Sequence, residues 1–166
     1  MPPLQLSEPA TELMGFLQQL PTESLIVAWP GQKETSLIPY VAGRPLFVYY
    51  KAHYPTYEQH ILSMRERMFD LIDAYLAQDQ QPLIDLYCRW QADYLVIDRT
   101  LLSGSYALLS YFEPFDERTK MMLEGVEKSQ LFLRQPPADA VVFTAANYTV
   151  LSLKLLAKNS NCLDGE

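Results

Sequence analysis

Three apolar segments of the sequence end beside charged or imidazole side chains. Residues 24–29, 46–50 and 93–98 each have the length and the continuous apolar character of a strand that is buried on both faces. In an open parallel sheet, ligands bind beyond the carboxyl ends of the strands, so a small-anion site is expected there if the protein has one. The candidate ligand-binding residues at or after these ends are Lys33, Lys51, His53, Asp98 and Arg99, and Arg44, which precedes the second segment, is a further candidate.

The end of the first segment carries part of a phosphate-binding pattern. Gly31 and Lys33 precede Thr35 and Ser36, which open a predicted helix. A P-loop needs the spacing G-x-x-x-x-G-K-[ST], and the dinucleotide pattern G-x-G-x-x-G is also absent from the sequence. Capping of the helix by Thr35 or Ser36 explains the same residues, so we expect no nucleotide cofactor.

The histidines and serines do not complete a catalytic or metal site. His53 and His60 are separated by Pro55 and lack a nearby cysteine or carboxylate partner for zinc. His53 has the titration range of a general base, although a histidine on a loop or helix surface is the commoner case. Ser103 and Ser105 do not form the G-x-S-x-G pattern. We expect no metal and no catalytic activity from this domain alone.

Asp98 and Arg99 close the third segment and have two interpretations. An aspartate at a strand end can accept a phosphoryl group, or hold Mg²⁺ beside a lysine such as Lys51, but that chemistry needs further carboxylates. The alternative is that Asp98 caps the next helix and Arg99 pairs with a surface carboxylate. The charged residues 65–67 are explained in the same way, as a solvated helix face.

An alternation of helices and strands must position these residues. Apolar residues recurring every three or four positions predict the longest helix over residues 56–77. Helices between the first three strands imply crossover connections and parallel pairing. The predicted fold is α/β, three-layer and Rossmann-like, with parallel core strands and a C-terminal antiparallel hairpin of residues 140–144 and 148–153, which would form an edge. The other helices are predicted over residues 7–20, 34–41, 81–91, 101–111 and 116–133.

The composition is that of one acidic domain. The 166 residues are 49% hydrophobic, which is enough for a core, and the formal net charge of −7 argues against a nucleic-acid partner. We expect a single domain over residues 1–166, with an ordered core of residues 7–157 and a flexible tail of residues 158–166. Cys88 follows an apolar helical pattern typical of a buried free thiol, and Cys162 falls in the tail; their redox state is left open.

The sequence contains no signal for insertion into a bilayer. No stretch approaches the roughly 20 apolar residues of a spanning helix, and the first residues lack the features of a signal peptide. We therefore expect no direct bilayer insertion by this segment, whether or not it belongs to a longer protein. The oligomeric state is left open.

Several segments together resemble a known family. Residues 17–153 resemble the soluble C-terminal domain of bacterial multi-pass membrane proteins of the glycosyltransferase type, which use lipid-linked sugars. Residues 44–77 especially resemble membrane proteins of photosynthetic bacteria. The segments that carry the resemblance are Leu20-Pro21 before residues 24–28, residues 38–45 (IPYVAGRP) and residues 92–98 (ADYLVID), with a long helix before the last.

The resemblance implies a domain without catalytic residues of its own, because the catalytic carboxylates of that family lie in loops of the membrane part. It also implies an extracytoplasmic, periplasmic location, with the membrane-embedded part of the same or a partner protein as the binding partner. A non-catalytic accessory domain of this kind is the leading hypothesis.

Two other hypotheses come from the residues themselves. A stand-alone cytoplasmic protein could bind a small anion, or act as an enzyme, at the strand ends. It predicts that Asp98→Ala abolishes binding without unfolding the protein. A protein-interaction module would instead show an exposed apolar patch on residues 101–115.

Overall fold

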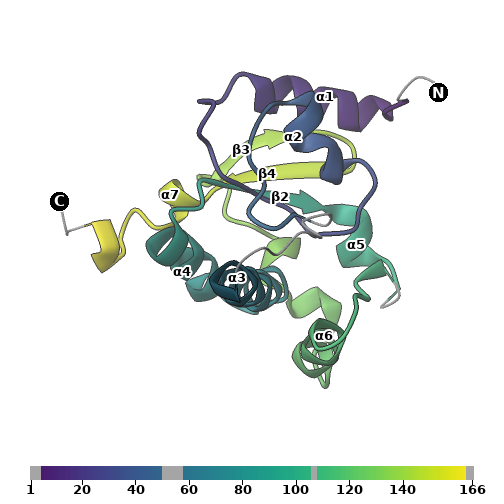
Figure 1. The fold of residues 1–166 in the computed structure, drawn as a ribbon, viewed down its shortest axis with the longest axis vertical. Coiled ribbons are helices and arrows are strands. Elements are labelled where there is room, and N and C mark those ends of the chain that lie inside the picture. Colours follow the sequence, from purple (N-terminus) through teal and green to yellow (C-terminus); the bar gives the residue numbers. More distant parts are fainter. Residues whose placement is uncertain (1–4, 50–57, 106–107, 164–166) are drawn as a thin grey trace.

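The computed structural model describes residues 5–49, 58–105 and 108–163. Figure 1 shows a small central sheet with helices on either side of it. The strands are β1 (Ile26–Val27), β2 (Tyr94–Asp98), β3 (Val141–Thr144) and β4 (Tyr148–Ser152). The helices are α1 (Glu8–Gln18), η1 (Thr35–Leu37), α2 (Ile38–Val41), α3 (Glu58–Tyr75), α4 (Gln81–Trp90), α5 (Arg99–Ser103), α6 (Phe115–Leu123), η3 (Lys128–Gln130), η4 (Phe132–Arg134), α7 (Leu153–Leu156) and η5 (Asn161–Leu163).

The sheet is mixed, with the strand order β1-β2-β4-β3. β1 and β2 are parallel, whereas β4 is antiparallel to both β2 and β3. The predicted hairpin is therefore confirmed. Of its two strands, β3 forms an edge of the sheet, whereas β4 lies inside it. The burial of the strands explains this order, because all five residues of β4 are buried whereas β3 alternates between half-buried and exposed residues.

Among the described residues, the predicted parallel pairing forms a ladder only between β1 and β2. The segment 46–50 was expected to form a full strand, but among the described residues it makes a single parallel bridge, Leu46 with Ile26. Ile26 donates its N–H to the carbonyl of Pro45 at 2.9 Å, and Phe47 donates to the carbonyl of Ile26 at 2.8 Å. Since Pro45 has no N–H to donate, the pairing cannot extend backwards along this segment. The Rossmann-like description is thus not supported, and the fold is a mixed α/β sheet.

Two hydrophobic clusters cover the two faces of this sheet. Successive strand residues point to opposite faces, so on β2 Leu95 and Ile97 join one cluster and Val96 joins the other. The first cluster includes residues of α3, α4 and α6, and the second includes residues of α1 and α2. Figure 1 shows α1 and α2 on one side of the sheet and α3, α4 and α6 on the other. β2 is therefore buried on both faces, as its apolar sequence predicts.

The long predicted helices in the second half are shorter in the structure. The helix expected over residues 101–111 is the five-residue α5, which ends before Gly104. The helix expected over residues 116–133 is α6, which ends at Leu123 just before Gly125, whose φ is 72°. A positive φ is easily adopted only by glycine and does not continue a helix.

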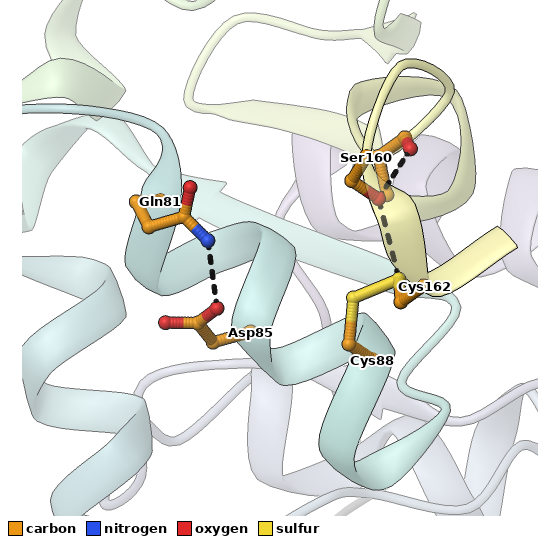
Figure 2. Close-up of a disulfide and its surroundings, with 6 residues drawn as sticks. Gln81, Asp85, Cys88, Ser160 and Cys162 are labelled. Carbon is orange, nitrogen blue, oxygen red and sulfur yellow. Dashed lines mark hydrogen bonds between the residues drawn. A yellow bond between two sulfur atoms is a disulfide. The ribbon is translucent and has the colours of Figure 1, made fainter. Parts of the chain in front are cut away.

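Cys88 and Cys162 form a disulfide, which corrects the expectation of a buried free thiol. Figure 2 shows the bond joining α4 to the segment that follows α7. The helical period places Leu83 and Leu86 in the core and leaves Cys88 exposed on another face of α4. The chain returns to this face 74 residues later, and the two Cα atoms lie 5.6 Å apart.

Candidate functional site at the end of β1

The structure separates the residues predicted to form one ligand site. Lys33 and Asp98 line the same hollow, of about 250 Å³, beside Glu34 and Asn147. Arg99 lines a different hollow, of about 450 Å³. The candidates Lys51 and His53 lie outside the described residues.

Asp98 caps the helix that follows it, as one of the two sequence interpretations predicts. Its Oδ1 accepts a hydrogen bond from the backbone N–H of Thr100 at 2.9 Å and from the Thr100 hydroxyl at 2.6 Å. These bonds satisfy a donor at the start of α5 that would otherwise lack a partner. The Asp98 side chain is therefore committed to holding α5 at the end of β2.

Arg99 does not pair with a surface carboxylate, contrary to the expectation from sequence. Its Nε donates to the hydroxyl of Thr149 at 3.1 Å and its Nη2 donates to the carbonyl of Ala145 at 3.0 Å. Within the described part of the chain, no carboxylate lies within ion-pair distance of Arg99. The guanidinium thus ties the start of α5 to the β3–β4 hairpin.

Arg44 is a buried structural residue rather than a ligand. Its guanidinium donates to the carbonyls of Gln18, the last residue of α1, and of Leu20, and to those of Ala42 and Gly43 after α2. The last carbonyls of a helix lack partners within the helix, and a cation near them is favourable. Gly43 has a φ of 66°, so the chain turns there and brings Arg44 back to both helix ends.

Glu34 joins three parts of the fold beside the hollow that Lys33 and Asp98 line. It accepts hydrogen bonds from the Ser7 backbone N–H at 2.8 Å, from the Ser7 hydroxyl at 3.0 Å and from the Tyr148 hydroxyl at 2.8 Å. Burial alone would raise the pKa of Glu34, but these bonds and the nearby Lys33 together hold it below its ordinary value. Burial first, and then the bond to Glu34, raise the pKa of Tyr148.

The charges around this hollow do not suit an anion. Asp98 and Glu34 contribute two carboxylates, and Lys33 contributes one ammonium. Each carboxylate also has protein donors in place, so neither needs a ligand to complete its hydrogen bonds. Glu34 and Asp98 therefore hold α1, α5 and β4 together beside this hollow.

A second concave feature, the β1 cavity, lies directly after β1. It is bounded by residues 28–31, by residues within 35–40 and by residues within 46–49, and it has a volume of about 70 Å³. Trp29 and Thr35 line it and are buried, with 2% and 3% of their surface exposed. The Trp29 indole Nε1 and the Thr35 hydroxyl oxygen are buried and have no hydrogen-bond partner among the described residues.

The expected role of Thr35 and Ser36 as helix caps is therefore wrong. Neither η1 nor α2 has a side-chain cap. Ser36 instead donates its hydroxyl to the carbonyl of Lys33 at 2.9 Å, and the Thr35 hydroxyl is buried with no partner in the part of the chain that the structure describes. The sequence signal for this cavity was an aromatic residue at a strand end followed by Pro30 and Gly31, but residue type alone does not reveal an unpaired indole.

The Trp29 ring packs against a buried aromatic side chain of α3. It packs against the ring of Tyr75 with 5.1 Å between centroids, and the Tyr75 hydroxyl accepts the backbone N–H of Asp98 at 2.9 Å. Tyr75 is fully buried, and this burial raises its pKa well above the ordinary value, so the phenol stays neutral. The indole therefore packs against the neutral Tyr75 ring, which a hydrogen bond to β2 holds in place.

Comparison with known proteins shows a likeness to a solved structure. No protein-family model matches the chain, and no curated protein matches it significantly. Among solved structures, the fold is similar to the C-terminal globular domain of an oligosaccharyltransferase from Archaeoglobus fulgidus, with a TM-score of 0.52 and 10% sequence identity. The likeness covers 90% of this chain and 99% of that domain. The chain shares the fold of that domain.

The likeness agrees in kind with the resemblance seen in the sequence, but at 10% identity it concerns the fold alone. No residue role is transferred from the archaeal domain. Among the described residues, no helix is long and apolar enough to span a membrane. The same residues contain no group of three or more potential His, Cys, Asp or Glu metal ligands.

The apolar patch predicted on residues 101–115 is present only in part. Leu108 and Phe112 are exposed, whereas Leu101, Leu109 and Phe115 are buried in the core. Residues 106 and 107 of this segment lie outside the described residues, so the patch stays a prediction there.

Proposed function

We propose that this chain is a non-catalytic accessory domain of a membrane glycosyltransferase-like protein, and that it faces an extracytoplasmic compartment. The observation that carries the proposal is the fold, because nearly the whole chain matches nearly the whole C-terminal globular domain of an oligosaccharyltransferase. The sequence resemblance of residues 17–153 to domains of membrane glycosyltransferases supports the same assignment independently of the structure.

The disulfide between Cys88 and Cys162 supports the proposed extracytoplasmic location. Disulfides persist in oxidising surroundings, such as the periplasm or the cell exterior, and are rare in a reducing cytosol. Cys88 and Cys162 are both exposed, so a cytosolic reductant would reach the bond between them. An extracytoplasmic domain would keep the bond intact without special protection.

The domain's own residues support a role in positioning rather than in chemistry. Asp98, Arg99, Arg44 and Glu34 are each engaged in bonds that hold elements together. Such a rigid junction would suit a domain that packs against a membrane-embedded part and helps to place an acceptor or partner.

The test is an immunoblot of fractionated source cells with an antibody against this domain. We expect a band much larger than the 19.1 kDa of this chain, confined to membranes and degraded when protease is added to spheroplasts. A soluble band near 19.1 kDa, protected inside the cells, would overturn the proposal. That result would favour the stand-alone cytoplasmic protein.

A further inference from the structure

The hollow that Arg99 lines contains a second arginine, Arg134, which is not among the ligand candidates of the sequence. This hollow, which we name the arginine hollow, is bounded by residues of α5, η4 and the β3–β4 hairpin and has a volume of about 450 Å³. One water molecule needs roughly 15 Å³ by a comparable measure. The arginine hollow therefore has room for a small ligand.

The lining of the arginine hollow is positively charged. Among the residues that the structure describes, it contains two charged side chains, Arg99 and Arg134, and no carboxylate. Neither guanidinium lies within ion-pair distance of a carboxylate in the same part of the chain, whereas those of Arg89 and Arg118 do. Two cations thus share one hollow on a chain whose formal net charge is −7. An anion bound there would relieve the repulsion between them.

The fold holds each guanidinium in place and leaves part of it unbonded. Arg99 is tied to the hairpin by its bonds to the Thr149 hydroxyl at 3.1 Å and the Ala145 carbonyl at 3.0 Å. Arg134 is tied to α5, because its Nη1 donates to the carbonyl of Leu102 at 3.3 Å. A guanidinium carries five N–H donors, so each arginine keeps donors that no described residue accepts. Two anchored groups with spare donors are thus already in position for a ligand.

We infer that the arginine hollow binds a phosphate group with two negative charges, as in a phosphate monoester. Its charge equals that of the two arginines, and the planar guanidinium suits paired hydrogen bonds to phosphate oxygens. A carboxylate carries one charge and would leave one of the two cations uncompensated. The exposed hydroxyl of Thr144 adds a further donor to the lining. The inference goes beyond the proposed function and does not depend on a membrane tether.

The first experiment follows backbone amide signals of the ¹⁵N-labelled 166-residue chain at constant ionic strength. The probe is phenyl phosphate at about pH 8, well above the second pKa of about 6 of a phosphate monoester, with acetate as the singly charged comparison. We expect saturable shifts at Ser103 and Thr144, which line the arginine hollow. Gln32 and Asn147, which line the hollow beside Asp98, are the internal controls and should not shift.

Two outcomes of this titration would overturn the inference. One is the absence of saturable shifts at Ser103 and Thr144 with phenyl phosphate up to about 50 mM, well above the millimolar range of weak binding. The other is binding of acetate as tight as that of phenyl phosphate, which would show that the hollow does not select two charges. Neither outcome bears on cell fractionation, so failure here is distinguishable from failure of the proposed function.

Matched glutamine substitutions test the role of the arginines. Arg134→Gln should weaken binding of phenyl phosphate about ten-fold or more, because it removes a charge-assisted hydrogen bond to the ligand. Arg65→Gln is the control, since Arg65 is exposed on α3, does not line the arginine hollow, and loses the same charge. That variant should keep the wild-type affinity within about two-fold. Equal weakening by the two substitutions would show a general charge effect and overturn the inference.

Lipid vesicles distinguish a phosphate on a lipid headgroup from a phosphate on a soluble ester. The full chain is sedimented with phosphatidylcholine vesicles that contain or lack phosphatidic acid. Co-sedimentation that needs phosphatidic acid and is lost in Arg134→Gln would identify a lipid phosphate, whereas binding of phenyl phosphate without co-sedimentation would identify a soluble ester. Either result supports the inference, and binding to neither probe overturns it.

Discussion

Arg44 lies where the C-terminal ends of α1 and α2 meet, and its guanidinium bonds to carbonyls from both. The sequence analysis includes this residue among the ligand candidates. Its 7% exposure and its carbonyl partners give it a structural role instead. A buried cation is acceptable here because several acceptors replace the water that it has lost.

Replacing Arg44 by lysine should lower the free energy of unfolding by about 2 kcal/mol or more. A lysine ammonium cannot reproduce the planar fork that reaches the carbonyls of Gln18, Leu20 and Ala42 together, and carbonyls left unpaired add their own cost. Urea denaturation measures the loss. The matched control is Arg134→Lys on an exposed arginine, which should change stability by less than about 0.5 kcal/mol. Equal effects of the two substitutions would contradict this role for Arg44.

At the scale of elements, Glu34 connects α1, the connection after β1, and β4. It receives bonds from Ser7, which caps α1, and from Tyr148, which begins β4. The capping of α1 by Ser7 was predictable from a serine just before a helical pattern with Pro9 in its first turn. Its second role, as a donor to a carboxylate 27 residues away, was not visible in the pattern.

Glu34→Gln should destabilise the protein by about 1 kcal/mol at pH 7. The pKa of Glu34 in the folded protein is lowered from the ordinary 4.5, so its ionised form stabilises the fold at neutral pH. This contribution is lost as the pH falls through the lowered pKa. The difference from wild type should therefore shrink at acidic pH below the ordinary value.

Urea denaturation at a series of pH values checks this prediction. Glu12→Gln, at an exposed position on α1, is the control and should follow the wild type throughout. A difference between Glu34→Gln and wild type that does not change with pH would show that the effect comes from shape and not from the charge.

At the scale of the whole molecule, the disulfide closes a large loop that contains most of the sheet. The bond joins residues 74 positions apart, and β2, β3 and β4 all lie between them. Closing a loop of this length lowers the entropy of the unfolded chain. In the chain-entropy description, this raises the free energy of unfolding by about 4 kcal/mol. The bond therefore stabilises the entire fold even though it lies at its periphery.

Removal of the disulfide should lower the free energy of unfolding by about 2–4 kcal/mol. The double variant Cys88→Ser/Cys162→Ser and the wild type with reductant should give the same reduced stability in urea. Reductant should have no effect on the double variant, which serves as the control. A loss below about 0.5 kcal/mol on reduction would contradict the predicted contribution.

The sequence by itself determined the local structure of this protein. The pattern of residues 7–20 predicted α1, the apolar run of residues 93–98 predicted a strand buried on both faces, and residues 140–153 predicted a hairpin. These features depend on the preferences of neighbouring residues and on hydrophobic period, both of which are written along the chain. The capping role of Asp98 is local in the same sense.

Only the tertiary structure decided which distant segments meet. It placed β4 between β2 and β3, reduced the segment at Leu46 to one bridge, and brought Cys162 to the exposed face of α4. It also left the Trp29 indole N–H and the Thr35 hydroxyl buried without a partner among the described residues. Each of these facts depends on contacts between residues far apart in the sequence, and such contacts are selected by the packing of the whole core, which local preferences do not encode.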